Sequence, residues 1–156
     1  LKFASKDIIT SLRETIWALK KDTYTASECL LRIRNFMQPF SRYYPNIQFK
    51  VEGHAPERKI LHYTEALNLV RMVQEAVTNA IKHAEATQIS VSSNPSPDLW
   101  EVSITDNGQG FIKESIMKSA AGNGLVNLQQ RAKDSGFDLS IQTTPGNGTS
   151  IRIQIA

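Results

Sequence analysis

The period of the hydrophobic pattern changes along the chain, and this change constrains the fold more than any other feature. From about Lys59 to Glu85, apolar residues recur every three to four positions, as on one buried face of a helix. Segments on either side alternate apolar and polar residues, which is the period of a strand with one buried face. Helices followed by β-hairpins, with few βαβ crossovers, predict an α+β sandwich: one mixed or antiparallel sheet with its helices on one face.

The strand-like segments fall mostly in pairs separated by turn residues. They cover residues 46–53, 87–93, 99–106, 137–143 and 149–156. NPSP (residues 94–97) predicts the turn of one hairpin, and PGNG (residues 145–148) predicts the turn of the last. Further helices are expected over residues 3–21, 25–43 and 125–134, with a short helical piece near 113–118.

The composition is that of a soluble globular domain, since 40% of the 156 residues are hydrophobic and 21% are charged. This length suffices for one domain with a core of its own. The net charge of +3 comes from scattered Lys and Arg residues, which argues against a nucleic-acid partner. The single cysteine, Cys29, excludes an intramolecular disulfide and a cysteine-based metal site, and it is expected simply to pack. No run of 18 apolar residues predicts a membrane span.

The segment QEAVTNAIKHA (residues 74–84) places Glu75, Asn79, Lys82 and His83 on one side of the long helix and apolar residues on the other. Such a stripe is commonly a solvated face. Asn is a mediocre helix former, however, and oxygen ligands in line with cations suit a metal and a phosphate chain laid along the helix. On this second interpretation the Asn79 amide oxygen binds Mg²⁺, and Lys82 and His83 face phosphate oxygens.

DNGQG (residues 106–110) directly follows a strand-like segment. By itself it is good turn chemistry. Two glycines on either side of Gln109 also suit a backbone that must stay slim beside a ligand. The Asp106 carboxylate, at the end of a buried strand, is placed to accept a hydrogen bond from an exocyclic amine, which adenine offers and guanine does not offer at the same place.

Two more glycine motifs follow. GNGL (residues 122–125) lies at a loop-to-helix junction, where free amides at a helix N-terminus bind anions. A flexible linker explains the same composition, and SAAGNG (residues 119–124) is also typical of a mobile lid. GNGTS (residues 146–150) is by default a tight hairpin turn.

Taken in this order, the four motifs resemble those of the Bergerat-fold (GHKL) ATPases, the group that includes gyrase, HSP90, histidine kinases and MutL. QEAVTNAIKHA resembles the N box, DNGQG the first glycine box, GNGL the second, and GNGTSIRI the closing glycine-threonine element. The resemblance covers residues 59–156 and is greatest to sensor histidine kinases that pair with helix-turn-helix response regulators. LRETIWAL (residues 12–19) also resembles the end of the dimerisation helix that precedes the ATP-binding domain in such kinases.

The resemblance implies a role for each matching residue. Asn79 would hold Mg²⁺, and Glu75 would orient water, the metal or the histidine that receives the phosphate. Asp106 would accept a hydrogen bond from the adenine amino group, with Thr149 supporting the adenine side. The other residues that the resemblance implies in nucleotide binding are Lys82, His83, Gly108, Gly110, Gly122, Gly124 and Leu125.

The same resemblance implies that residues 1–22 are the end of a dimerisation or linker helix and that residues 23–156 are an ATP-binding catalytic domain, with ATP and Mg²⁺ as cofactors. The phosphoacceptor segment of these kinases, an acid and two basic residues before LHD, is missing. His54, His62 and His83 do not replace it. Because the chain begins inside a helical pattern without Met, we expect a fragment whose acceptor histidine lies upstream.

Three partners are therefore expected besides ATP: the upstream dimerisation domain, a response regulator, and a second copy in the full-length homodimer, the fragment itself being a monomer. The resemblance places the domain in the cytoplasm, where ATP is found, as part of a membrane-anchored sensor. The first helix would transmit the signal state, with Trp17 and Leu19 as its contact residues.

Other functions remain open on the sequence. A serine-directed protein kinase of the anti-sigma-factor kind would need no histidine domain, although LRETIWAL argues against it. A docking module that binds nucleotide without catalysis is a third possibility, against which the intact Asn79, Asp106 and glycine set argue. A gyrase-like or chaperone ATPase fits less well, because a transducer sequence is lacking and the lid is short. The kinases that this sequence resembles are expected to lack an aromatic-rich box between the two glycine boxes. The sequence fits, because Phe111 is the only aromatic residue there.

Overall fold

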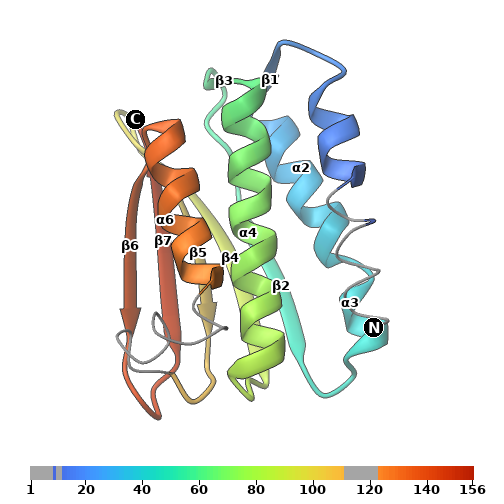
Figure 1. Ribbon diagram of the computed structural model, residues 1–156, viewed down its shortest axis with the longest axis vertical. Coiled ribbons are helices and arrows are strands. Elements are labelled where there is room, and N and C mark those ends of the chain that lie inside the picture. The colour runs from blue at the N-terminus through green and yellow to red at the C-terminus, as the bar shows by residue number, and fades with distance from the viewer. Residues whose placement is uncertain (1–8, 10–11, 111–122) are drawn as a thin grey trace.

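The computed structural model describes residues 9, 12–110 and 123–156, which Figure 1 shows as two layers, a sheet behind and helices in front. The sheet has the strand order β2-β4-β5-β7-β6. The strands are Gln48–Gly53 (β2), Gln88–Pro95 (β4), Trp100–Asp106 (β5), Asp138–Thr143 (β6) and Thr149–Ile155 (β7). The expected two-layer α+β sandwich is confirmed.

The sheet is mixed. The β4–β5 and β6–β7 hairpins are antiparallel as predicted, and β5 also pairs with β7. β2 pairs with β4 in parallel, so the chain between them crosses over the sheet. β4 continues through Pro95, which pairs with Trp100, and the turn predicted at residues 94–97 therefore begins two residues later. Proline is tolerated here because the pairing of β2 ends at Ser93, so no strand lies on the other side of Pro95.

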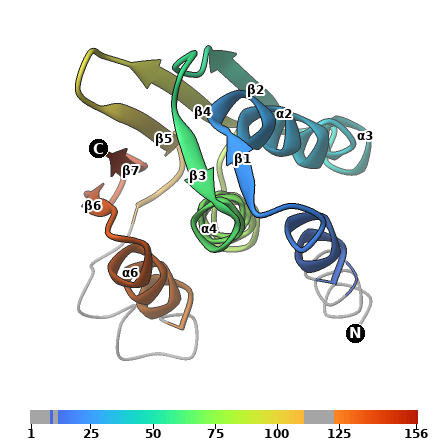
Figure 2. The same cartoon turned by 90° about the horizontal axis from the view of Figure 1, so that it is seen from above.

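The helical layer has α4 at its centre. The helices cover residues 12–18 (the N-terminal helix), Ala26–Met37 (α2), Phe40–Tyr43 (α3), Tyr63–His83 (α4) and Asn123–Ser135 (α6). Seen from above, α4 lies between α6 and the N-terminal helix (Figure 2). None of the described helices has the length and apolar character needed to cross a lipid bilayer.

The apolar flank of α4 forms the centre of the core. Leu69, Val73 and Val77 are completely buried and belong to one hydrophobic cluster with residues of β4, β5 and β7. Cys29 of α2 belongs to the same cluster, and burial raises the pKa of its thiol to about 12. The thiol is therefore protonated at neutral pH and packs as a small apolar group, as the sequence predicted.

A short antiparallel ribbon replaces the expected first turn of the long helix. β3 (Ile60–His62) pairs with β1 (Thr23–Thr25), and α4 begins only at Tyr63. The predicted start near Lys59 is therefore wrong. His62 caps the helix together with Glu65, whose carboxylate accepts a hydrogen bond from the His62 amide at 2.9 Å. Three-residue strands are too short to show a period, so only their pairing reveals them.

The second predicted helix, residues 25–43, is also interrupted. α2 ends at Met37 and α3 starts at Phe40, with Pro39 at its N-cap. Proline lacks the amide hydrogen that would continue the hydrogen bonding of α2, so the helix ends here although Gln38 still has helical dihedral angles. The helical piece expected near 113–118 lies outside the described residues.

The N-terminal helix packs on the rest of the domain through polar contacts on one side. Glu14 is only 4% exposed and forms an ion pair with Arg32 of α2, with a shortest N–O distance of 2.6 Å. The Trp17 ring lies 4.3 Å from the Tyr24 ring, and the Tyr24 hydroxyl donates to the Ala18 carbonyl at 3.0 Å. Trp17 thus contacts the domain, whereas Leu19 is 65% exposed, and their part in transmitting a signal state stays a prediction.

We expect Glu14→Ala to detach the N-terminal helix without unfolding the domain. Arg32 would lose its charged partner, at a cost of about 1–3 kcal/mol confined to that helix. Hydrogen exchange should show lower protection of the amides in residues 12–18 and unchanged protection in α4. The control is Asp98→Asn, which removes an acidic charge from an exposed turn. Equal protection of residues 12–18 in the wild type and Glu14→Ala would contradict the prediction.

Candidate nucleotide-binding site

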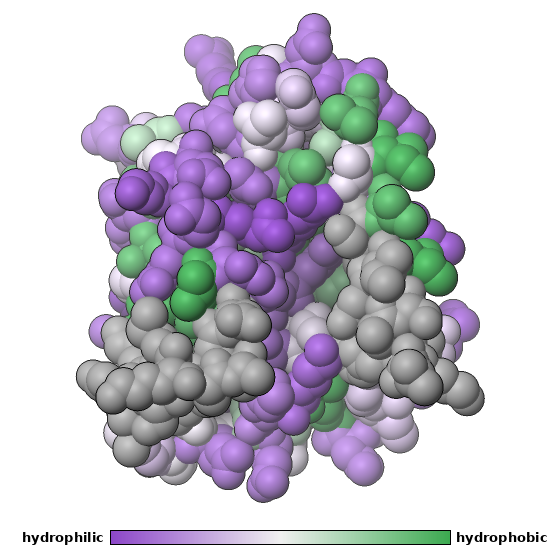
Figure 3. Space-filling view, in the orientation of Figure 1, coloured by the Kyte–Doolittle hydropathy of each residue, from purple (hydrophilic) through white to green (hydrophobic). Residues whose placement is uncertain are grey.

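The polar stripe of α4 lines a cleft of about 790 Å³. Its floor is α4, and its walls come from the N-terminal helix, from the α2–α3 region and from Arg131 of α6. Figure 3 shows a hydrophilic band down this face, between α6 and the N-terminal helix. The lining residues from α4 are Arg71, Gln74, Glu75, Thr78, Asn79, Ile81 and Lys82.

Three of the four stripe residues therefore face the same cavity. Glu75 and Asn79 are half-buried there, and Lys82 is exposed at its rim. His83 is exposed and is not among the lining residues. Its backbone carbonyl instead accepts a hydrogen bond from the Gln109 side chain at 3.0 Å. The cleft thus contains the amide and the amine of the predicted stripe. His83 lies outside it, where the end of α4 contacts the DNGQG loop.

Asp106 is the last residue of β5 and is half-buried. Its carboxylate accepts a hydrogen bond from the Gly108 amide at 2.8 Å and another from the backbone of Thr149. Burial raises the pKa of Asp106 above its ordinary value, and these two hydrogen bonds offset only part of the effect. A carboxylate held in this way is a strong acceptor at the end of a strand.

The DNGQG loop is fastened to its neighbours on both sides. The Gln109 amide donates to the carbonyl of Ala84, just after α4, at 2.7 Å. The Asn107 side-chain oxygen accepts from the amides of Thr87 and Gln88 at 2.9 Å each. Sequence reasoning did not single out Asn107 and Gln109 for these roles. The only available signal was that Asn and Gln stand beside a turn glycine, where side chains often bond the backbone.

The glycines of this region make room for the protein's own backbone. A Cβ atom added at Gly108 would lie 2.2 Å from the Ala84 carbonyl oxygen, and one at Gly148 would lie 2.2 Å from the Asp106 carbonyl oxygen. A Cβ at Gly110 would lie 2.1 Å from the Thr144 oxygen. From the sequence, these glycines were expected to leave room for a ligand. In the structure they let the DNGQG loop contact the end of α4 and the β6–β7 turn.

Gly124 brings α6 against Asn79. An added Cβ there would lie 2.4 Å from the Asn79 side-chain nitrogen, so a larger residue would have to displace this amide. Leu125, which follows, is 3% exposed and belongs to the hydrophobic core. Thr149 is also buried, with its hydroxyl 2.9 Å from that of Thr143. Gly122 lies outside the described residues.

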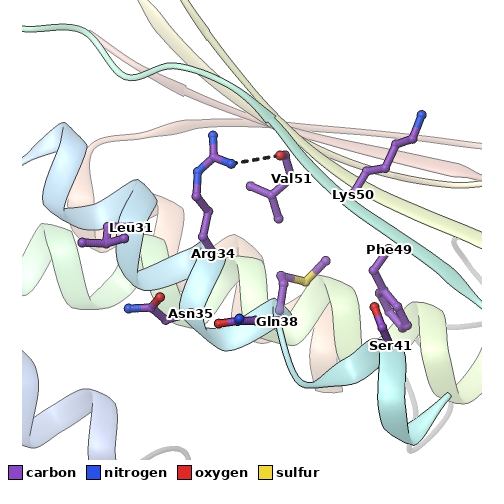
Figure 4. Close-up of a pocket in the computed structure, with 9 residues that line it drawn as sticks. Leu31, Arg34, Asn35, Gln38, Ser41, Phe49, Lys50 and Val51 are labelled. Atoms are coloured by element: carbon purple, nitrogen blue, oxygen red, sulfur yellow. Dashed lines mark hydrogen bonds between the residues drawn. The ribbon is translucent and has the colours of Figure 1, made fainter.

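A second hollow, of about 410 Å³, lies between α2, α3 and the edge strand β2 (Figure 4). Arg34 spans its edge and donates to the carbonyls of Val51 at 3.1 Å and Gly53 at 3.0 Å. None of the site residues predicted from the sequence lines it. The nucleotide motifs therefore gather around the α4 cleft and the C-terminal end of α4, and not here.

This fold and these motifs are those of a nucleotide-binding α+β domain, and one known family matches most of it. Residues 64–156 match the model of the histidine kinase-, DNA gyrase B- and HSP90-like ATPase family. The chain belongs to this family.

Several sensor kinases are similar in sequence. An uncharacterized sensor-like histidine kinase of Chloroflexus aurantiacus is 45% identical over 89 residues, which are 54% of this chain and 15% of that protein. The histidine-protein kinase/phosphatase DegS of Brevibacillus brevis is 30% identical over 151 residues, 96% of this chain and 38% of that protein. The chain thus spans well under half the length of these relatives.

Solved structures of the same fold include the histidine kinase domain of the Erythrobacter litoralis EL346 blue-light activated histidine kinase. Its TM-score is 0.70 at 19% identity, covering 93% of this chain and 74% of that one. The ATP binding domain of PrrB from Mycobacterium tuberculosis has a TM-score of 0.63 at 23% identity, covering 86% of this chain and 97% of that one. At this level of identity the likeness shows a shared fold.

The raised pKa of Asp106 predicts how the stability of the fold changes with pH. Because the folded state holds this proton more tightly, the neutral carboxyl stabilises the fold at low pH, and this contribution is lost as the pH rises from about 3.9 through the folded-state pKa. A ¹³C NMR titration of the folded protein should place the Asp106 midpoint above that of the same carboxyl in the urea-unfolded chain. A folded-state midpoint at or below the unfolded one would contradict the burial argument.

Proposed function

We propose that the chain is the ATP-binding catalytic domain of a sensor histidine kinase. It would donate the γ-phosphate of ATP to a histidine of an upstream dimerisation domain, for relay to a response regulator. The observation that carries the proposal is that both motifs meet α4 near its C-terminal end. Asn79 lies in the cleft, and Asp106 belongs to the loop that bonds Ala84 through the Gln109 amide. Relatives named as sensor histidine kinases support the same conclusion.

In this proposal the adenine lies at Asp106, whose carboxylate accepts a hydrogen bond from the exocyclic amine. Buried Thr149, paired with Asp106 in the sheet, supports this side of the ring. The phosphates extend along α4 toward Asn79, with Lys82 at the rim of the cleft as a counter-charge. His83 would contact phosphate only from its exposed position beside the cleft.

The residues present fit Mg²⁺. The Asn79 amide is half-buried and faces the cleft, and its oxygen is the kind of ligand that Mg²⁺ accepts while keeping several waters. The glycine at position 124 leaves this amide its place against the start of α6, which an added Cβ would occupy. When bound, the metal would neutralise charge on the phosphate chain. Glu75, one turn before Asn79 in the same cleft, is placed to orient water or the incoming imidazole.

Phosphoryl transfer needs positioning and charge neutralisation more than covalent chemistry from the protein. The bond from the γ-phosphorus to the ADP oxygen would break as a bond to the imidazole nitrogen forms. His54, His62 and His83 are all exposed, and none of them lines the cleft. The acceptor would therefore come from the dimerisation domain and enter the cleft from outside.

The N-terminal helix supports the proposed boundary between residues 22 and 23. The apolar residues within and next to this helix are 49–65% exposed and follow the 3-4-3 spacing of a coiled-coil seam: Ile9, Leu12, Ile16 and Leu19. Figure 3 shows hydrophobic surface on the side where this helix lies. We infer that this seam continues the dimerisation helix, and that the domain acts in the cytoplasm as part of a membrane-anchored homodimer. No specific observation favours a serine kinase, a docking module or a gyrase-like ATPase.

The first test is calorimetric binding of ATP and ADP, with and without Mg²⁺, to the wild type and to Asp106→Asn. We expect adenine-selective binding that responds to Mg²⁺ and falls at least about tenfold in the variant, because an amide cannot replace a charged acceptor. GTP is the ligand control, and Asp98→Asn is the protein control. Absence of binding by a well-folded wild type would overturn the nucleotide site and, with it, the proposed kinase function.

Gly124→Ala separates metal binding from folding. Alanine in a helix is favoured over glycine by up to about 1 kcal/mol, so the thermal stability should hold or rise. The added methyl must nevertheless displace the Asn79 side chain, and the Mg²⁺-dependent part of the ATP affinity should fall about tenfold. Gln129→Ala, on the exposed face of the same helix, is the control. Wild-type Mg²⁺ dependence in Gly124→Ala would refute the role of Asn79.

A further inference from the structure

A second polar cluster lies in the cleft, closer to the N-terminus of α4 than Asn79. It consists of Gln74 and Arg71 from α4 and Arg131 from α6, all of which line the cleft. Arg71 and Arg131 lie outside the motifs that define the nucleotide site, and Gln74 is the first residue of QEAVTNAIKHA, without a ligand role of its own so far. Their position, their buried nitrogen atoms and their charge each point to a ligand.

The position follows from the packing of α4 against α6. Gly124, at the start of α6, faces Asn79, whereas Ser135, at its end, accepts a hydrogen bond from Asn68 at 2.8 Å. The two helices are therefore antiparallel, and Arg131 lies opposite the N-terminal half of α4. At 1.5 Å per residue, Gln74 and Arg71 lie about 7.5 and 12 Å from Asn79 along the helix axis.

Two nitrogen atoms of this cluster are buried without an acceptor among the described residues. They are Nε2 of Gln74 and Nε of Arg131. Gln74 as a whole is only 9% exposed. Arg131 does reach Asn68 through another nitrogen, at 3.4 Å. Buried donors without acceptors are costly and rare in folded proteins, so two of them beside one cleft need an explanation.

The charge of the cleft points to an anion. Five cationic side chains line it against two acidic ones: Arg13, Arg32, Arg71, Lys82 and Arg131 against Glu14 and Glu75. Glu14 is already engaged by Arg32. Arg71 and Arg131 line the same cleft, and burial, followed by the neighbouring charge of Arg131, lowers the pKa of Arg71.

We propose that Gln74, Arg71 and Arg131 form a binding site for a phosphoryl group beyond Asn79, at the end of the cleft away from the adenine. The proposal rests on the proposed function, because the line from Asp106 through Ala84 to Asn79 directs the phosphates of a bound nucleotide toward this cluster. Guanidinium groups bind phosphoryl oxygens through paired hydrogen bonds, and the Gln74 amide supplies one more donor. The phosphoryl group comes either from the γ-phosphate of ATP or from free inorganic phosphate.

The test compares AMP-PNP, ADP and inorganic phosphate on the 156-residue chain, for the wild type, Arg131→Ala and Arg131→Lys. If the γ-phosphate binds here, Arg131→Ala lowers the AMP-PNP affinity about tenfold or more and leaves the ADP affinity unchanged. Arg131→Lys should restore part of the loss, because it keeps the charge without the planar fork. Arg152→Ala, exposed on β7, removes one positive charge elsewhere and should change neither affinity.

If free phosphate is the ligand, ³¹P NMR of inorganic phosphate should show saturable binding to the ADP-loaded wild type, and Arg131→Ala should abolish it. The site is overturned if Arg131→Ala changes neither the ratio of AMP-PNP to ADP affinity nor phosphate binding. A wild type that binds no adenine nucleotide would instead sink the proposed function, whatever it does with phosphate.

A second variant guards against misfolding. Gln74→Leu removes a buried donor that has no acceptor among the described residues, so the ligand-free protein should keep or gain thermal stability. The same variant should weaken whichever phosphoryl ligand Arg131→Ala weakens. A stable Gln74→Leu protein with wild-type affinity for AMP-PNP and for phosphate would remove Gln74 from the site and contradict the proposed cluster.

Discussion

The packing of one flank of α4 on the sheet is the contact on which the rest of the molecule depends. Leu69, Val73 and Val77 are completely buried against the strands, so the opposite flank must face outward. That flank becomes the floor of a cleft because α6 and the N-terminal helix stand on either side of it. A single amphipathic helix thus couples the stability of the core to the position of Asn79. If α4 rotated to move Asn79, its apolar flank would be exposed to water.

Close backbone contacts give the site its second constraint. Gly108 and Gln109 hold the DNGQG loop against Ala84, and Gly148 lets the β6–β7 turn approach Asp106. Asp106 is therefore positioned relative to α4 by the protein itself, before any ligand is present. A site preorganised in this way loses little further freedom on binding, which favours affinity. The same contacts explain why three glycines cluster where the chain has to pass close to its own backbone.

Local patterns predicted much of this structure, and contacts between distant residues account for the rest. The β4–β5 and β6–β7 hairpins were predictable because turn residues and alternating strands lie next to each other in the sequence. The β1–β3 ribbon was missed because its two three-residue strands are 34 residues apart and show no period. The single helix expected over residues 25–43 ignored Pro39. Asn107, Gln109 and Arg131 escaped notice because each contacts a partner far along the chain.

The sequence by itself determined the two-layer fold, the family, and the polar stripe on α4, because the period of a helix fixes which side chains share a face. Only the tertiary structure decided which of those side chains share a cleft. It placed Glu75 and Asn79 in the cleft with Lys82 at the rim, left His83 outside, and brought Arg131 of α6 into the same cleft as Arg71. The reason is physical. Periodicity specifies only the direction in which a side chain points around its own helix axis. The distance between two helices depends on how closely their facing side chains pack, as the missing Cβ of Gly124 shows.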